Sequence, residues 1–305
     1  MPDVPVLLPR TPLYQALNSD RYARQEAICK IQRHTGRKLL VYETNVMLNT
    51  AALSLDDVQP FGDLLAPLIP GEPVDLLVHS PGGDVDAAEK IVYMCRHRRS
   101  GGLRAIVPEY AKSAATLMAL ASDEVVMGIT SELGPIDAQV PTKGPGGQTI
   151  WVSAQSFLDE FETIKQEVAA TGTLSAAYFP LLEGINIGFI GLCRNSMDRS
   201  KQFAMKWLKQ HMLRIGEYEP MEEPDRDQLA AKIAESLCAV KTWLTHGAVI
   251  DADETKKLGI RVNYLEPEDP LWQMVWYLHC CYSVLFRTQG VTKIYESATV
   301  SLAFS

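Results

Sequence analysis

The sequence predicts an α/β fold with a mostly parallel sheet. Apolar, strand-like runs alternate along the first half of the chain with segments of helical spacing, and turns rich in glycine and proline separate them. This alternation is typical of βαβ units, whose crossover helices make neighbouring strands run parallel. The chain has 305 residues, of which 47% are hydrophobic and 22% charged, so it can form one large globular domain or two small ones.

The first elements can be placed in order along the chain. Residues 13–36, "LYQALNSDRYARQEAICKIQRHTG", predict one amphipathic helix closed by glycine. Strands are expected in "RKLLVYETN", "VDLLVHS", "LRAIVPE" and "DEVVMG". Helices are expected in "SLDDVQPFGDLLAPLI", with Ser54 as a candidate N-cap, and in "DVDAAEKIVYMCRHRR" and "SAATLMALAS".

The pattern changes after Gly128. "PTKGPGGQ" is a predicted loop, residues 152–213 are mainly helical, and "GEYEPMEEPDRDQ" is an acidic surface connection before a helix at 228–239. "LTHGAVIDADETKKLGIRV" predicts a turn, a short helix and a short strand, and an aromatic helix, "LWQMVWYLHCCYSVLF", precedes a β-prone tail. Four segments are therefore expected: an N-terminal helical extension (1–36), the core (37–150), a mainly helical insertion (151–227), and C-terminal helices and tail that complete the core and form an interface (228–305).

Charge and composition exclude several classes of partner. The net charge of −8 and the pI near 5.3 argue against nucleic acid or an anionic membrane surface. The longest apolar runs, such as "LLEGINIGFIGL", are too short to span a bilayer, and "MPDVPVLLPRTPLY" does not resemble a signal peptide. Six cysteines without metal-ligand spacing indicate reduced thiols of a cytoplasmic protein rather than a metal site or disulfides.

Two adjacent glycines follow the second predicted strand, in "HSPGGDVDAAEKI". Gly82 and Gly83 could form a structural turn, or they could present backbone N–H groups to an anion or oxyanion. A second polar turn follows the next strand, where Ser113 opens a helix of small residues and the N–H of Ala114 faces the same space. A serine there is usually only an N-cap. Because both turns lie at the carboxyl ends of neighbouring parallel strands, together they favour a catalytic cleft.

"HSPGGDVDAAEKI", "VPEYAKSAATLMALASDEVVMG" and "SELGPIDAQV" together resemble the Clp-protease/crotonase fold. More specifically, they are similar to the serine dehydrogenase proteinase (SDH) family, relatives of the signal-peptide-peptidase-A-type serine proteases. The resemblance continues through "VSAQSFLDEFE" and "LTHGAVIDADETKKLGIRV" to "GVTKIYES". It implies a parallel sheet of repeated ββα-type units with an added helical region, usually assembled into a homo-oligomer. It also implies Ser113 as nucleophile, with an oxyanion hole of N–H groups from Gly82, Gly83 and Ala114.

The residue that would activate the serine is an open question, because the resembling families use either a Ser–His–Asp triad or a Ser–Lys dyad. Where the relatives place the lysine of the dyad, this chain has Asp159. Lys112, Lys143 and Lys165 are alternative bases, but a lysine base must be desolvated and the sequence shows this for none of them.

A histidine base is the other possibility. By pattern, His246 falls near the position of the Clp triad aspartate and Asp137 near that of the Clp histidine, so the two roles could be exchanged. Ser113 would then attack, His246 would take its proton, and Asp137 would orient the imidazole. The alternatives stay open: His246 as a turn or capping histidine, Asp137 as a loop aspartate that bonds its own backbone, and a site without a competent base.

The leading functional hypothesis is a cytoplasmic serine peptidase that cleaves peptides or unfolded protein segments through an acyl-enzyme. Two other classes compete with it: a non-catalytic scaffold that keeps the fold, and an acyl-CoA enzyme of the crotonase type. No cofactor or metal is expected. The chain has neither a GxGxxG fingerprint nor a P-loop, so any unfoldase would be a separate partner.

Two further histidines are expected to have structural roles. His79, beside the glycine turn, is expected to be a strand-end residue satisfied by backbone hydrogen bonds. His279 is expected to be a core or interface histidine on the apolar face of the aromatic helix.

Overall fold

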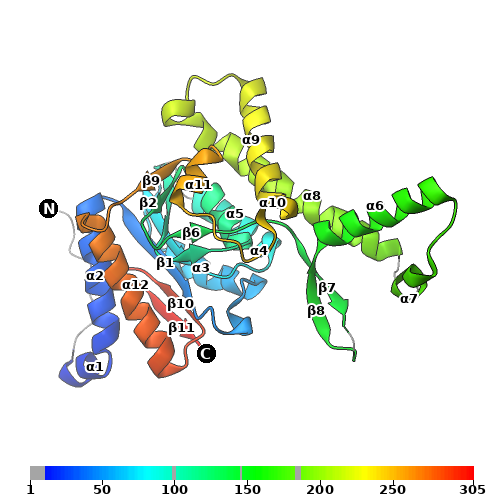
Figure 1. The fold of residues 1–305 in the computed structure, drawn as a ribbon. Coiled ribbons are helices and arrows are strands. Elements are labelled where there is room, and N and C mark those ends of the chain that lie inside the picture. The colour runs from blue at the N-terminus through cyan, green and yellow to red at the C-terminus, as the bar shows by residue number, and fades with distance from the viewer. Residues whose placement is uncertain (1–10, 98–100, 145, 183–186) are drawn as a thin grey trace.

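A seven-stranded, mostly parallel sheet forms the centre of the protein (Figure 1). The computed structural model describes residues 11–97, 101–144, 146–182 and 187–305. The sheet has the order β11-β10-β1-β2-β3-β5-β9. Five strands run parallel: β1 (Lys38–Thr44), β2 (Val74–His79), β3 (Leu103–Val107), β5 (Glu124–Met127) and β9 (Val262–Tyr264). Two antiparallel strands extend the β1 edge: β10 (Lys293–Glu296) and β11 (Ser301–Phe304). The predicted fold class, α/β with a mostly parallel sheet, is confirmed.

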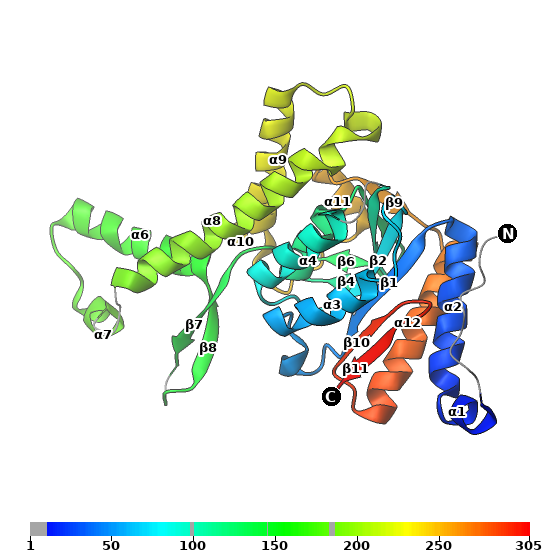
Figure 2. The ribbon, with the colours of Figure 1, turned by 180° about the vertical axis from the view of Figure 1, so that it is seen from behind.

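Helices bury both faces of this sheet, which explains why its strands are almost continuously apolar. In β1, Leu39 and Val41 point to one face while Leu40 and Tyr42 point to the other. The first face is covered by two long helices that lie side by side (Figures 1 and 2): α2 (Ser19–Thr35) and α12 (Pro270–Gln289). The second face is covered by α3 (Val58–Leu65), α4 (Val85–His97) and α5 (Ala114–Leu120).

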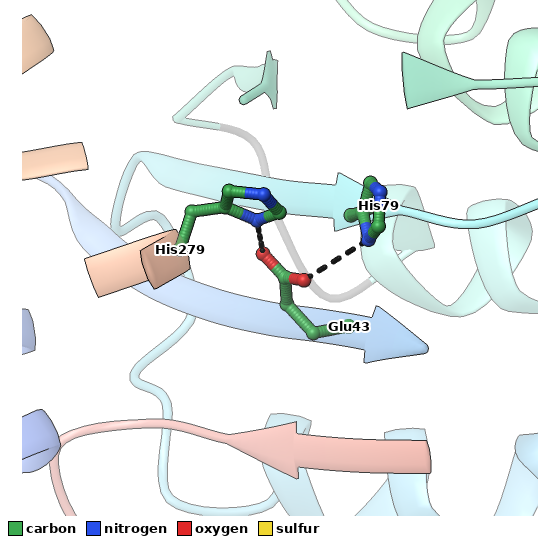
Figure 3. Close-up of side chains that lie close together, drawn as sticks. All are labelled: Glu43, His79 and His279. Carbon is green, nitrogen blue, oxygen red and sulfur yellow. Dashed lines mark hydrogen bonds and ion pairs between the residues drawn. The ribbon is translucent and has the colours of Figure 1, made fainter. Parts of the chain in front are cut away.

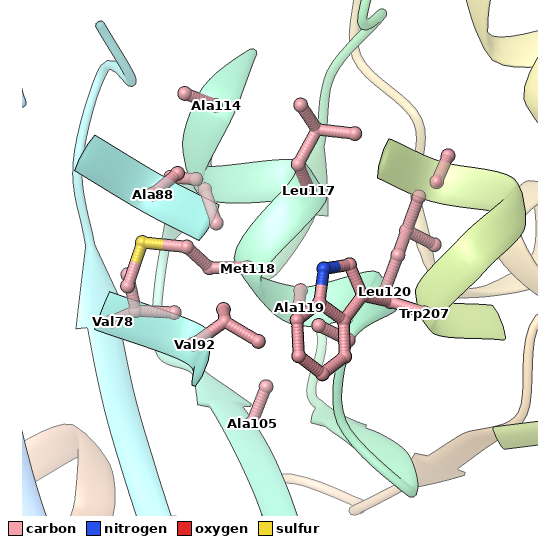
Figure 4. Close-up of a cluster of buried hydrophobic side chains, with 14 of the residues drawn as sticks. Val78, Ala88, Val92, Ala105, Ala114, Leu117, Met118, Ala119, Leu120 and Trp207 are labelled. Carbon is pink, nitrogen blue, oxygen red and sulfur yellow. The ribbon is translucent and has the colours of Figure 1, made fainter. Parts of the chain in front are cut away.

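The short helix α5 lies in the middle of the larger core (Figure 4). Every one of its residues is buried. Alanines at positions such as 114 and 119 let its backbone approach the strands and α4 closely, while Leu117 and Met118 fill the space between. Burying each large apolar side chain contributes about 1.5–3 kcal/mol. Trp207 of α8 (Ile187–Gln210) packs against the far side, so α5 is held from several directions.

Two very short strands pair parallel beside the sheet: β4 (Tyr110–Ala111) and β6 (Glu132–Leu133). The chain therefore runs β3–β4–α5, which is a ββα unit of the expected type. A parallel bridge between Ser80 and Ala111 joins the end of β2 to β4. This bridge aligns the two turns that the sequence singled out.

An arm extends from the sheet between β6 and α9 (Figures 1 and 2). It contains a hairpin, β7 (Gln139–Lys143) and β8 (Thr149–Ser153), and the helices α6 (Ala154–Thr171), α7 (Phe179–Leu182) and α8. The predicted loop "PTKGPGGQ" was therefore wrong at its start, because Pro141, Thr142 and Lys143 pair with β8 as part of β7. These strands are largely exposed, so they lack the apolar alternation that marks a half-buried strand.

Other expectations are confirmed with changed boundaries. Residues 13–36 form two helices, α1 (Pro12–Leu17) and α2, because the chain breaks at Asn18. Ser54 is the N-cap of a 3₁₀ turn, and its N–H donates to Asp57 Oδ2 at 2.7 Å. The remaining helices are α9 (Glu223–Cys238), which begins earlier than predicted, α10 (Val240–Trp243) and α11 (Ala252–Lys257).

Within the described ranges, no helix has the length and apolar character needed to cross a bilayer. The stretch "MPDVPVLLPRTPLY", which was not expected to be a signal peptide, covers residues 1–14, and the first ten of these lie outside the described part. The division into an extension, a core, an insertion and a C-terminal part stays a prediction.

Candidate active site

Ser113 occupies a strained turn between β4 and α5. Its backbone angles are φ 52° and ψ −119°, and Leu244 is the other non-glycine residue with positive φ in the described part of the chain. Such a conformation costs about 1–3 kcal/mol and persists only where the surroundings impose it. A sharp strand-to-helix turn that exposes a serine hydroxyl is the usual geometry of a nucleophilic serine in α/β hydrolases.

Gly82 lies directly against this turn. A Cβ atom at Gly82 would come within 2.4 Å of Lys112 O and 2.7 Å of the Cβ of Ser113, so no other residue fits without displacement. Gly82 also has a φ of 87°, which favours glycine. Gly83 is equally enclosed, since a Cβ there would lie 2.3 Å from Leu53 O. The double glycine therefore allows the turn after β2 to contact the turn at Ser113.

The backbone amides of the predicted oxyanion hole are not equivalent. The Gly82 N–H donates to Ser80 Oγ at 3.2 Å, so it already has an acceptor. For the N–H groups of Gly83 and Ala114, no acceptor is found among the described residues. Ala114 N lies 2.8 Å from where a Gly82 Cβ would be, so its amide belongs to the same contact. Gly83 and Ala114 are thus better placed to donate than Gly82.

Asp137 and His246 form a close pair, as the exchanged arrangement requires. His246 Nδ1 lies 2.6 Å from Asp137 Oδ1. Asp137 is buried, and its other oxygen accepts from Gln139 Nε2 at 2.9 Å, which fixes the carboxylate. The His246 side chain remains 29% exposed. A carboxylate at Nδ1 favours the tautomer whose Nε2 lone pair is free to accept a proton.

The segment that carries Asp137 is anchored to α5. The N–H of Gly134 donates to Thr116 Oγ1 at 3.1 Å, and this hydroxyl lies on the first turn after Ser113. The N–H of Ile136 donates to Leu237 O at 3.0 Å, which joins the same segment to α9. Asp137 is therefore positioned from both sides.

The turn that carries His246 is anchored to the same region. Leu133 and Ile250 form an antiparallel bridge, with Leu133 N–H donating to Ile250 O at 2.9 Å. Lys112 Nζ donates to Ala248 O at 2.9 Å, so the residue before Ser113 holds the loop two residues after His246. These contacts bring the Ser113, Asp137 and His246 segments together.

Lys112 has a positioning role in these contacts. Its ammonium also reaches Leu133 O at 3.1 Å and Glu132 Oε1 at 2.7 Å. Three acceptors on two different loops occupy this group. Lys112 therefore joins the loops around Ser113, and its contacts give no support to a role as base.

The other lysine candidates belong to the arm. Lys143 is exposed on β7, and Lys165 is exposed on α6, where it pairs with Glu162 at 2.6 Å. Asp159, which stands where the dyad relatives have lysine, accepts from Gln155 Nε2 at 2.7 Å and lies 3.5 Å from Lys241 Nζ. The positions of Lys143 and Lys165 therefore give no support to a lysine base for Ser113.

A second polar cluster was missed by the sequence analysis (Figure 3). His79 Nδ1 lies 3.2 Å from Glu43 Oε2, and His79 Nε2 lies 3.2 Å from Glu109 Oε2. His279 Nδ1 lies 2.8 Å from Glu43 Oε1, and His279 Nε2 lies 3.2 Å from the same Glu109 oxygen. The expectation that backbone bonds satisfy His79 was wrong, because its ring lies between two carboxylates. The core placement of His279 is confirmed.

The charges of this cluster support one another. Burial alone would raise the pKa of Glu43, but the imidazoles of His279 and His79 outweigh it and hold that pKa below its usual value. The hydrogen bond from His279 and the nearby imidazole of His79 also lower the pKa of Glu109. Burial would lower the pKa of His279, but Glu43 and Glu109 together raise it to about 10. No local sequence signal marks these residues, since they come from four separate segments.

The comparison with known families bears on this region of the chain. The model of a family described as ClpP-like SDH-type serine proteinase matches residues 66–158. The predicted resemblance is confirmed. The matched range holds the glycine turn, Ser113 and Asp137, whereas His246 lies beyond it.

Two uncharacterized proteins of Methanocaldococcus jannaschii are similar to the chain. One is 30% identical over 191 residues, which cover 63% of this chain and 52% of the relative. The other is 29% identical over 201 residues, which cover 65% of this chain and 56% of the relative. The chain thus spans about half the length of the curated relatives it matches.

Two kinds of solved structure are similar to the chain. ClpP1 from Listeria monocytogenes is 11% identical, with a TM-score of 0.39, and the match covers 84% of this chain and 99% of that one. The membrane-bound stomatin-specific protease 1510-N is 14% identical, with a TM-score of 0.35, and the match covers 71% of this chain and 94% of that one. The family resemblance itself rests on the sequence match.

Proposed function

We propose that the protein is a serine peptidase in which Ser113, His246 and Asp137 form the catalytic triad. The observation that carries this proposal is the strained turn at Ser113, which lies against Gly82 and beside two amides for which the described residues offer no acceptor. A strained backbone at a serine is typical of a nucleophile whose geometry is fixed before the substrate arrives. The pair of His246 and Asp137, at 2.6 Å, supplies a base with its orienting carboxylate.

The proposed reaction follows from these positions. Ser113 Oγ attacks the scissile carbonyl while His246 Nε2 accepts the hydroxyl proton, and Asp137 stabilises the imidazolium that forms. The N–H groups of Gly83 and Ala114 donate to the developing oxyanion, and losing one such donor typically costs about 3–4 kcal/mol of transition-state stabilisation. Collapse of the intermediate releases the amine, which takes the proton from His246. Water then hydrolyses the acyl-enzyme by the same steps in reverse.

The proposed substrates are peptides or unfolded protein segments, because a backbone carbonyl must reach the contact between the two turns. A folded substrate would need a separate unfoldase. We also propose a homo-oligomer, in which assembly or substrate brings the His246 turn onto Ser113. The positive φ of Leu244, at 64°, marks the start of that turn.

A fluorophosphonate serine probe tests this function directly, with four variants compared with the wild type: Ser113→Ala, His246→Ala, Asp137→Asn and, as a control on the arm, Lys165→Ala. We expect labelling of the wild type and of the control, none in Ser113→Ala, and strongly slowed labelling in the other two. Labelling that survives the His246 and Asp137 changes would contradict the triad. A folded wild type that is never labelled would favour the non-catalytic scaffold, for which the Asp159 departure is the support.

A further inference from the structure

The cluster of Glu43, His79, His279 and Glu109 has the composition of a metal site. It combines two imidazoles with two carboxylates, which are the nitrogen and oxygen ligands that divalent transition metals prefer. The four side chains come from β1, the end of β2, α12 and the segment that follows β3. Figure 3 shows the rings of His79 and His279 on either side of the Glu43 carboxylate.

Several atoms of this cluster lack well-aligned hydrogen bonds. Glu43 Oε2 and both ring nitrogens of His79 are buried, and none of them has a hydrogen-bond partner of good geometry among the described residues. The His79 contacts of 3.2 Å to Glu43 and Glu109 are therefore ion-pair distances without hydrogen-bond alignment. Buried polar atoms are nearly always satisfied, so the unaligned contact between Glu43 Oε2 and His79 Nδ1 indicates a missing partner.

We propose that Glu43, His79 and His279 bind one divalent transition-metal ion through Nδ1 of each ring, while Glu109, which faces Nε2 of both histidines, orients the imidazoles. One ligand atom from each of the first three residues lies within 4.8 Å of the others, and all three residues are buried. A tetrahedral ion with bonds of about 2.0–2.1 Å needs neighbouring ligand atoms roughly 3.3–3.5 Å apart. Small side-chain rotations close this difference.

Charge balance supports such an ion. The buried Glu43 carboxylate requires positive charge nearby, because an unpaired buried charge is strongly destabilising, and the half-exposed Glu109 carboxylate adds a second negative charge to the cluster. Two protons, one on each imidazole, or a single divalent cation satisfy this requirement equally. The ion would therefore replace two protons with no change in the net charge of the cluster. Metal affinity should then rise with pH, since the histidines must be neutral to bind.

The site can be reached from the side of Glu109. The Glu109 side chain is 48% exposed, so an ion can enter from its side, whereas Glu43, His79 and His279 close the interior. A bound ion would fasten α12 to the ends of β1 and β2, directly before the turn at Ser80 and Gly82.

Zinc titration of the full-length protein tests the proposal without using its activity. After treatment with a chelator, isothermal titration with Zn²⁺ at pH 6, 7 and 8 should give one ion per chain and an affinity that rises steeply with pH. Cobalt should give the visible absorption of a low-symmetry nitrogen and oxygen site. Zinc should also raise Tm by several degrees, because a ligand that binds only the folded state stabilises it.

Variants separate this site from adventitious binding. Glu109→Gln, at the partly exposed residue that orients both imidazoles, should weaken zinc binding at least about tenfold while the protein stays folded. His279→Gln should abolish the cobalt spectrum. His97→Gln, at an exposed histidine of α4, is the matched control and should bind zinc like the wild type. Absence of stoichiometric binding at pH 8, or zinc binding unchanged in both Glu109→Gln and His279→Gln, would overturn the proposal. Neither result depends on whether Ser113 is catalytic.

Discussion

His246 and Asp137 meet at 2.6 Å although 109 residues separate them in the chain. The pairing depends on two loops, one after β6 and one before α11, which the bridge between Leu133 and Ile250 holds together. The order of the residues, serine, aspartate, histidine, differs from that of the Clp triad. Triad chemistry requires side chains that touch and not a given order along the chain. The arrangement therefore fits a base and orienting group whose positions have been exchanged.

Asp137→Asn should reduce the rate of probe labelling and of peptide cleavage by about 10⁴ if the triad operates. The amide keeps the shape of the carboxylate but favours the wrong tautomer of His246. Labelling kinetics measure the loss, and circular dichroism checks that the fold is kept. Asp253→Asn, on α11, is the matched control and should label normally. A loss below tenfold with an intact fold would argue that Asp137 only shapes the loop.

Gly82→Ala should lower the free energy of unfolding by well over 1 kcal/mol and abolish labelling of Ser113. The added Cβ would meet Lys112 O at 2.4 Å, in addition to the strain of its positive φ. Gly36→Ala is the control, because Gly36 also has a positive φ, of 68°, but nothing lies within 4 Å of its Cβ position. Denaturant unfolding of both variants separates crowding from backbone strain. If Gly82→Ala and Gly36→Ala lowered the free energy of unfolding equally, the contact between Gly82 and the Ser113 turn would be loose.

The sequence predicted the parts of the fold that local patterns encode. Apolar runs bounded by turns located the parallel strands, and the residue types after two of them located Gly82, Gly83 and Ser113. The pairing of His246 with Asp137 came from the family resemblance, because no local pattern joins two loops so far apart. The hairpin at 139–153 was missed since its strands are exposed and carry no alternation.

The Glu43 cluster could not be found from sequence for a different reason. Its residues lie on three regular elements and one connection, each in a segment whose apolar neighbours dominate the pattern. Glu43 reads as the end of a strand and His279 as one position of an aromatic helix. Their proximity depends on how α12 packs on the sheet, and only tertiary structure determines that.

Arg24→Met should lower the free energy of unfolding by about 3–5 kcal/mol, because it leaves the buried Glu296 without its partner. Arg24 Nε lies 2.9 Å from Glu296 Oε2, and both side chains are almost fully buried. Tyr282 donates to the same carboxylate at 2.6 Å and cannot neutralise it. Lys30→Met, which removes the exposed pair with Glu26, is the control and should cost under about 1 kcal/mol. A small cost at Arg24 would indicate that Glu296 becomes protonated or hydrated instead.

The stability of the protein should fall with acidification through His211. Burial, with Arg96 nearby, lowers the pKa of His211 to about 4 in the folded protein, whereas the unfolded chain has the ordinary value near 6.5. Between these values the unfolded state binds a proton that the folded state does not. The free energy of unfolding therefore falls as pH decreases from about 6.5 towards 4 and is unaffected by His211 above that window.

His211→Gln removes this group and tests its contribution. We expect the difference in unfolding free energy between variant and wild type to be constant above pH 7 and to shift in favour of the variant as the pH approaches 4. Urea unfolding at half-unit steps of pH measures this difference. The contributions of other titrating groups cancel in it, because both proteins share those groups. If the unfolding free energies of His211→Gln and the wild type changed in parallel between pH 6.5 and about 4, the buried ring would be protonated in the folded protein as easily as in the unfolded chain.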